Sequence, residues 1–231
     1  MATTVALLAA ALSYVALPNV KPAVQAAGHK RENLYQQMKR STYTPYFVML
    51  VVMFIFAFGL SNFQSTIALY VDKQFQFTPK EISVVITVGG FVGVIVQTFV
   101  IDSLFKRFGE MRVILVNLIV SAAAMIGILF VNTFWTILFV SAIFFTAASL
   151  LRPAINTLIS KLAGDAQGYA AGMNNAYMSL GNMIGPALAG ILFDINMSFP
   201  YIAGTVILLV CFFIASSWSM KKKQLLQESR S

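Results

Sequence analysis

Residues 46–71 read YFVMLVVMFIFAFGLSNFQSTIALYV and contain no charged side chain. An α-helix needs roughly 20 mostly apolar residues to cross about 30 Å of hydrocarbon, and this stretch is longer than that. The whole chain has the same character, because 58% of its residues are hydrophobic and only 10% are charged. A typical soluble domain is about 25% charged. The sequence therefore predicts an integral membrane protein.

Six more stretches of similar character lie along the chain, and short polar turns separate all seven except the first two, which a longer connection joins. They cover approximately residues 2–17, 82–104, 113–130, 135–158, 169–193 and 201–220. The sequence Thr78-Pro79-Lys80-Glu81 has the N-cap, proline and glutamate of a helix start. The first stretch lacks the basic n-region of a secretory signal, so we interpret it as a membrane helix. The predicted fold class is an all-α polytopic membrane protein.

Composition also excludes several kinds of function. The net charge is +8, and the basic residues lie mostly between the apolar spans. This placement indicates membrane topology rather than a nucleic-acid-binding face. Cys211 is the only cysteine and there is one histidine, so neither a disulfide nor a metal-ligand cluster is expected. We find no nucleophile–base pair or phosphate loop, and we expect neither an enzyme nor a bound cofactor.

The basic residues predict the orientation. If the segments after the first, third, fifth and seventh spans face one side, that side holds 13 of the 16 basic residues. These are Lys21, Lys30, Arg31, Lys39, Arg40, Lys106, Arg107, Arg112, Lys161, Lys221, Lys222, Lys223 and Arg230. Because basic loops stay in the cytoplasm, we expect a plasma-membrane protein whose C-terminus is cytoplasmic.

One long connection suggests how the chain is divided. Residues 19–45 are polar and basic, and we interpret them as a cytoplasmic linker, either simply solvated or with an interaction role. The expected organisation is a membrane helix at 1–18, this linker, a six-helix bundle at 46–220 and a cytoplasmic tail at 221–231.

Polar side chains inside the spans are the functional candidates, because they are costly in hydrocarbon. Arg152 is the strongest candidate among them, and its guanidinium must face a cavity, pair with an acid or a carbonyl, or extend to the membrane surface. Pro153 frees a backbone carbonyl one turn upstream, which gives a local kink and could provide a hinge or a partner for Arg152. Gly185-Pro186 builds a bend into a span that also contains several asparagines, and its glycine serves either close helix packing or gating.

Several motifs in combination resemble one family. They are LRPAIN at 151–156, AGDAQG at 163–168, Met173-Asn174 and SLGNMIGP at 179–186, with FGLS at 58–61 and the segment 83–90. The chain is similar to the C-terminal half of the quinolone and multidrug efflux pumps, the drug:proton antiporters of the major facilitator superfamily. The resemblance implies that the seven spans are helices six to twelve of a twelve-helix transporter, which binds substrate between two bundles.

Two departures from that pattern affect the proton-coupling step. Gln64 and Ser149 stand where some relatives have acidic residues, and neither side chain can carry a proton. The loop at 102–109, DSLFKRFG, is a degenerate form of the superfamily's acidic-Arg-x-Gly motif. Within it, Asp102 could pair with a basic neighbour such as Arg107 and latch one conformation.

These observations lead to a functional hypothesis. We expect a secondary transporter, or its C-terminal portion, that exports small amphipathic compounds in exchange for protons. A facilitator for a sugar or peptide, a receptor and a non-transporting membrane scaffold remain alternatives. The expected partners are the lipid bilayer and either a missing N-terminal half or a second copy. The expected substrate-binding residues are Phe63, Gln64, Asn174, Tyr177 and Met178, and the expected coupling or conformational residues are Arg152, Pro153, Asp102, Arg107, Gly185 and Pro186.

Overall fold

A computed structural model describes residues 33–228 of the chain, and the part from Met38 onward forms one compact unit. The elements in order are α2 (Leu34–Ser41), α3 (Phe47–Phe75), α4 (Pro79–Phe108), α5 (Glu110–Gly127), the 3-10 turn η1 (Ile128–Phe130), α6 (Phe134–Ala163), the 3-10 turn η2 (Gly164–Ala166), α7 (Gln167–Ile195) and α8 (Phe199–Glu228). The described residues contain no strand. The predicted fold class, an all-helical membrane bundle, is confirmed.

The long helices coincide with the predicted spans. Five continuous helical stretches are long and apolar enough to cross a membrane, and one of them, 134–195, comprises both α6 and α7 joined through η2. Six spanning helices therefore correspond to six of the seven predicted spans. The other prediction, at residues 2–17, lies outside the described residues. Within the predicted linker the structure has a short helix, α2, that the sequence analysis did not foresee.

Local sequence explains where α4 begins and ends. The Thr78 hydroxyl accepts a hydrogen bond from the Glu81 backbone N–H at 3.4 Å, and a Glu81 carboxylate oxygen accepts the Thr78 N–H at 2.8 Å. This is a complete capping box with proline at the first helical turn, as predicted. Gly109 follows at φ 78°, a backbone conformation that favours glycine, and separates α4 from α5.

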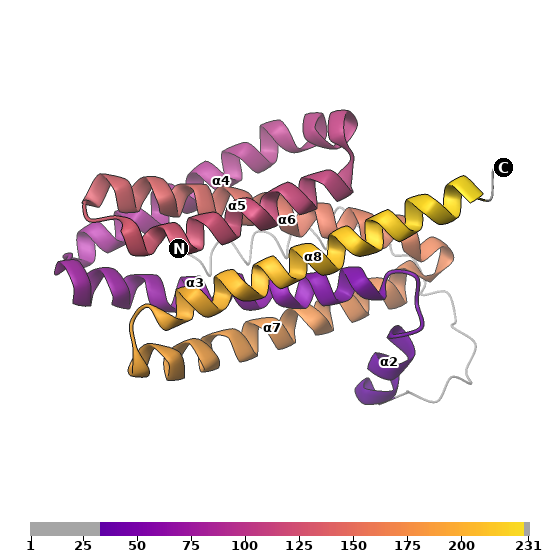
Figure 1. The fold of residues 1–231 in the computed structure, drawn as a ribbon, viewed down its shortest axis with the longest axis horizontal. Helices are drawn as coiled ribbons and strands as arrows, with labels where there is room; N and C mark the ends of the chain where they lie inside the picture. Colours follow the sequence, from indigo (N-terminus) through magenta and orange to yellow (C-terminus); the bar gives the residue numbers. More distant parts are fainter. Residues whose placement is uncertain (1–32, 229–231) are drawn as a thin grey trace, which may run out of the picture. The chain divides into compact units, whose positions relative to one another are not determined.

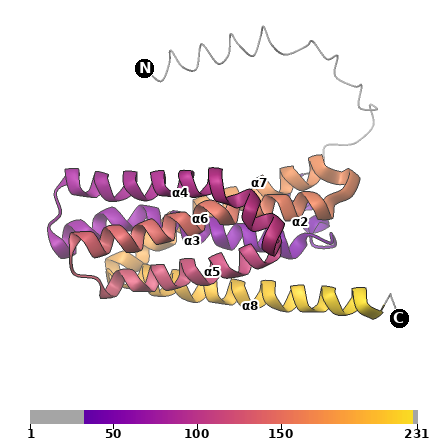
Figure 2. The ribbon, with the colours of Figure 1, turned by 90° about the horizontal axis from the view of Figure 1, so that it is seen from above.

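The core is built around α3. This helix packs against α6, α7 and α8, while α5 packs against α6 and α8. The ring of Phe63 stacks on Phe144 of α6, with ring centroids 3.9 Å apart, and Tyr201 of α8 meets the same ring edge-on. Figures 1 and 2 show these long helices lying side by side. The bundle is thus held by aromatic and aliphatic contacts between helices distant in sequence.

α4 is the least enclosed of the spanning helices. It packs mainly against α6, and it buries only Val85, Gly89 and Gly93. A Cβ at Gly93 would lie 3.2 Å from the Phe145 carbonyl oxygen, so glycine permits close approach of the two helices there. The remaining faces of α4 are open in this unit.

Glycine also sets the spacing between α3 and α7. A Cβ at Gly181 would lie 2.9 Å from the Phe58 backbone nitrogen, and one at Gly185 would lie 2.8 Å from the Phe58 carbonyl oxygen. Ordinary contact begins at 3.4 Å, so side chains larger than hydrogen do not fit at either position. Gly185, for which the sequence left close helix packing or gating open, therefore lies at a close contact between α7 and α3.

Candidate functional site

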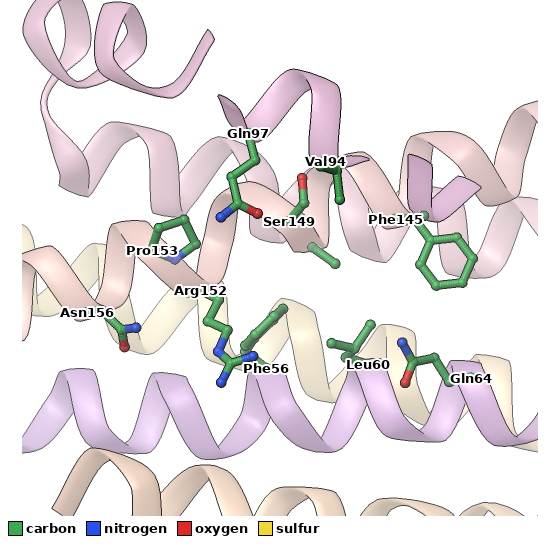
Figure 3. A pocket seen from close by; sticks show the side chains of 12 residues that line it. Phe56, Leu60, Gln64, Val94, Gln97, Phe145, Ser149, Arg152, Pro153 and Asn156 are labelled. Carbon is green, nitrogen blue, oxygen red and sulfur yellow. The ribbon is translucent and has the colours of Figure 1, made fainter. Parts of the chain in front are cut away.

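A cavity with a volume of about 540 Å³ lies between α3, α4 and α6. Each helix contributes side chains from one face, at intervals of three or four residues. Figure 3 shows side chains from the three helices pointing into this space. The lining residues are Phe56, Leu60 and Gln64 of α3, Gly90, Val94 and Gln97 of α4, and Phe145, Ala148, Ser149, Arg152, Pro153 and Asn156 of α6. We call this space the first cavity.

The lining of the first cavity is amphipathic. Aromatic and aliphatic side chains make up one part, and amide, hydroxyl and guanidinium groups make up the rest. Among the described residues that line this cavity, Arg152 alone is ionisable, and it extends from α6 toward α3 beside Phe56 (Figure 3). Its side chain is exposed, and no ion pair joins it to any residue that the structure describes. The first cavity therefore has a positive charge without a carboxylate in its wall.

Ser149 joins two walls of this cavity. Its hydroxyl lies 2.8 Å from the Thr146 carbonyl oxygen of its own helix and 3.0 Å from the Gly93 carbonyl oxygen of α4, and it can donate to either. Pro153 follows one turn later and continues the α6 helix without donating a backbone hydrogen bond. Ser149 thus helps to fix α4 against the helix that holds Arg152.

A second cavity adjoins the first and has a volume of about 460 Å³. Asn156 lines both cavities, and the rest of the second lining comes from α6 and α7. Asn174 Nδ2 donates a hydrogen bond of 2.9 Å to Asn156 Oδ1, whereas Asn174 Oδ1 is buried and has no partner among the residues that the structure describes. The described residues that line the second cavity are neutral amides, small residues and Ile159, and none of them is ionisable.

The structure distributes the predicted substrate-binding residues over several places. Gln64 lines the first cavity and Asn174 lines the second. Phe63 is fully buried in the aromatic core and does not line either cavity. Tyr177 lies 3.0 Å from Ser41 through their hydroxyl oxygens, and Met178 packs at the edge of the core. Gln64 and Phe63 are adjacent in sequence but face different environments.

The predicted coupling residues also separate into groups. Arg152 and Pro153 lie together in the first cavity. Asp102 is exposed and has no ion pair with any described residue, while the Arg107 guanidinium lies 5.4 Å from the ring centroid of Phe108. The structure therefore does not show an Asp102–Arg107 latch.

The remaining two, Gly185 and Pro186, lie within α7, and Gly185 packs against α3. An ion pair that the sequence analysis did not foresee joins Lys161 at the end of α6 to Glu110 at the start of α5. It lies at the same end of the bundle as the α4–α5 turn.

Sequence reasoning left several cavity residues out of its site. Gln97 and Asn156 line the first cavity, as do Phe56, Leu60 and Phe145. A detectable signal existed on α6, where Phe145, Ser149, Arg152 and Asn156 recur at helical spacing on one face. On α3 the sequence did not show that Phe56 rather than Phe63 lines the cavity, because α3 is apolar around most of its circumference.

Comparison with known proteins agrees with the resemblance seen in the sequence. The chain is 37% identical over 225 residues to multidrug resistance protein 2 of Bacillus subtilis (strain 168), which covers 96% of this chain and 56% of that protein. It is 36% identical over 219 residues to multidrug resistance protein 1 of the same organism, covering 94% and 55% of the two chains. It is 32% identical over 211 residues to quinolone resistance protein NorA of Staphylococcus aureus (strain COL), covering 88% and 54%.

The chain spans about half the length of these curated relatives. The sequence pattern of one family matches residues 49–230. The match begins at the third residue of α3 and includes all of α8. Together with the all-helical bundle described above, this match shows that the chain belongs to the Major Facilitator Superfamily.

Proposed function

We propose that the chain forms one bundle of an exporter for small amphipathic compounds, and that the first cavity is its share of the substrate pathway. The amphipathic lining of that cavity is the observation that carries the proposal. Binding cavities for small organic molecules typically measure about 300–1,000 Å³ and combine apolar walls with a few polar groups. The similar proteins named for multidrug and quinolone resistance support the same assignment.

The transport mechanism we propose is alternating access between two bundles. α4 has open faces, and three helices of this bundle converge on the first cavity. A second bundle placed against them would complete the cavity wall, and rocking of one bundle against the other would expose it to either side of the membrane. We propose that this second bundle is either a separate N-terminal half or a second copy of the chain.

Proton antiport is part of the proposal, but its carboxylate has to be supplied by the other bundle. The first cavity has Gln64 and Ser149, and no aspartate or glutamate is among its lining residues. Ser149 is hydrogen-bonded to backbone carbonyls, and a hydroxyl in that role does not exchange a proton with the transport cycle. The acid that accepts the proton is therefore expected outside this bundle.

The location we propose is the cell membrane, with the C-terminus in the cytoplasm. Lys106, Arg107 and Lys161 lie at the turns that join α4 to α5 and α6 to α7, and Lys221 begins the basic run at the end of α8. This distribution supports the cytoplasmic assignment of that end. Transport rather than catalysis is proposed as the activity, because the lining of both cavities offers binding groups without a nucleophile–base pair.

The test is proton-gradient-driven accumulation of a fluorescent dye in inverted membrane vesicles. One preparation contains the chain alone, a second contains the chain with the N-terminal half of multidrug resistance protein 2, and a third contains that half alone. Transport by the chain alone supports a half-size exporter acting with a second copy. Transport only in the second preparation supports a C-terminal half. No transport in either, with the chain correctly inserted, would overturn the proposed drug export.

A further inference from the structure

The first cavity places a cationic side chain in an amphipathic wall that has no acidic residue among its described lining. The eight acidic residues of the chain do not include any of the twelve that line this cavity. A guanidinium within a membrane span is costly unless it pairs with an anion or reaches water. The charge of Arg152 is therefore available to a ligand rather than committed to a neighbouring carboxylate.

We infer that the first cavity selects amphipathic compounds that carry a carboxylate, with Arg152 as the group that binds the carboxylate. This inference deepens the proposed function and rests on it for the role of the cavity in transport. A planar guanidinium matches a carboxylate with two parallel N–H···O hydrogen bonds, which is among the stronger pairings available in a protein. A cationic compound would meet the positive charge of Arg152 without an acid in the same wall to offset it.

The neighbouring polar groups are compatible with an anionic ligand. Three amide side chains line the same space, one from each helix: Gln64 of α3, Gln97 of α4 and Asn156 of α6 (Figure 3). Amide N–H groups can donate to carboxylate oxygens that the guanidinium does not satisfy. Because amides carry no net charge, they leave the positive potential of Arg152 in place.

The apolar part of the lining defines the rest of the ligand. Phe56, Leu60 and Phe145 provide aromatic and aliphatic surface on the walls formed by α3 and α6. An aromatic ring system attached directly to a carboxylate would contact these side chains while its carboxylate reaches Arg152. The expected class is thus an aryl carboxylate, and the matching neutral ester has the same apolar body without the charge.

The experiment compares two such ligands on the purified full chain in lipid nanodiscs. The probes are a fluorescent quinolone carboxylic acid that has no basic amine and its methyl ester, both titrated at neutral pH. Hydrogen bonds to charged groups contribute about 1.5–3 kcal/mol, so we expect the acid to bind roughly 10-fold or more tightly than the ester. Equal affinity for the two probes, or tighter binding of the ester, would overturn the inference.

Four variants test whether Arg152 in the first cavity causes the preference for the acid. Arg152→Gln should remove it, Arg152→Lys should restore part of it, and Arg112→Gln, whose side chain lines a separate groove, should leave it unchanged. Gln64→Glu should weaken binding of the acid by roughly 10-fold and change binding of the ester little, because a negative charge in the cavity lining would repel the anionic probe. Retention of the acid preference in Arg152→Gln or Gln64→Glu would contradict the assignment.

The outcomes separate this inference from the proposed function. Acid preference in nanodiscs without dye transport in any vesicle preparation would support the binding assignment and overturn drug export. Dye transport without a preference for the acid would support drug export and overturn the binding assignment. If Arg152→Gln is not obtained in a folded state, Gln64→Glu decides the question, since its side chain is exposed and the substitution is nearly isosteric.

Discussion

The packing of α7 against α3 leads to a quantitative prediction for Gly181→Ala. The added Cβ would lie 2.9 Å from both the Phe58 nitrogen and the Ala57 Cβ, and closer still to the Phe54 carbonyl oxygen. Ordinary contact begins at 3.4 Å, so the 2.9 Å contacts alone require the two helices to separate by 0.5 Å, and the closer Phe54 contact requires more. Because two of these three atoms belong to the backbone, no side-chain rotation relieves the clash. Overpacking of this kind typically costs about 1–3 kcal/mol.

Gly190→Ala is the matched control on the same helix, because a Cβ there has no neighbour within 4 Å. Both substitutions gain the same helix propensity of about 1 kcal/mol, so the difference between them isolates the packing cost. We expect Gly181→Ala to be less stable than Gly190→Ala by about 1–3 kcal/mol.

Thermal unfolding in detergent measures this difference. The assay follows the reaction of Cys211 with a fluorogenic maleimide, since this single cysteine is fully buried on α8 and becomes accessible only on unfolding. Equal midpoints for the two alanine variants would refute the proposed contact between α7 and α3.

Three further predictions concern single side chains. Asn62→Leu should raise the unfolding midpoint, because both amide atoms of Asn62 are buried without a partner and such groups cost about 1–3 kcal/mol each; a lower midpoint would show that Asn62 has a partner in the membrane. Cys211 itself should resist a small maleimide in the native protein and react fully after denaturation, and rapid native labelling would contradict its burial. Lys161→Ala should change stability by less than about 1 kcal/mol, because the Lys161 side chain in its ion pair with Glu110 is 60% exposed; a larger loss in thermal unfolding would show that this pair contributes more than an exposed pair normally does.

The sequence was sufficient for the spans because hydropathy is a local property. Each described helix of the bundle matches a predicted span, and the Thr78 cap was predicted from four residues. α2 was missed because it is only eight residues long and mostly polar. It therefore lacks the apolar run by which the other helices were predicted.

The candidate site was only partly predictable. Gln64 and Arg152 stood out because polar groups in a membrane span are rare, and both line the first cavity. Phe56 and Phe63 have the same side chain on the same helix, yet one lines the cavity and the other stacks on Phe144. Since α3 is surrounded by α6, α7 and α8, its hydrophobic pattern does not identify which face is open. That choice depends on tertiary packing.

The central claim is that compounds bind in the first cavity, and substrate protection of a single cysteine tests it most directly. Val94→Cys places a thiol on α4 in the cavity wall, and Ser83→Cys places one at an exposed position on the same helix outside it. Cys211 can stay in place because it is buried. We predict that a saturating quinolone carboxylate slows maleimide labelling at position 94 and leaves position 83 unchanged. Labelling at position 94 that is unaffected by the ligand, or slowed equally at both positions, would contradict the account.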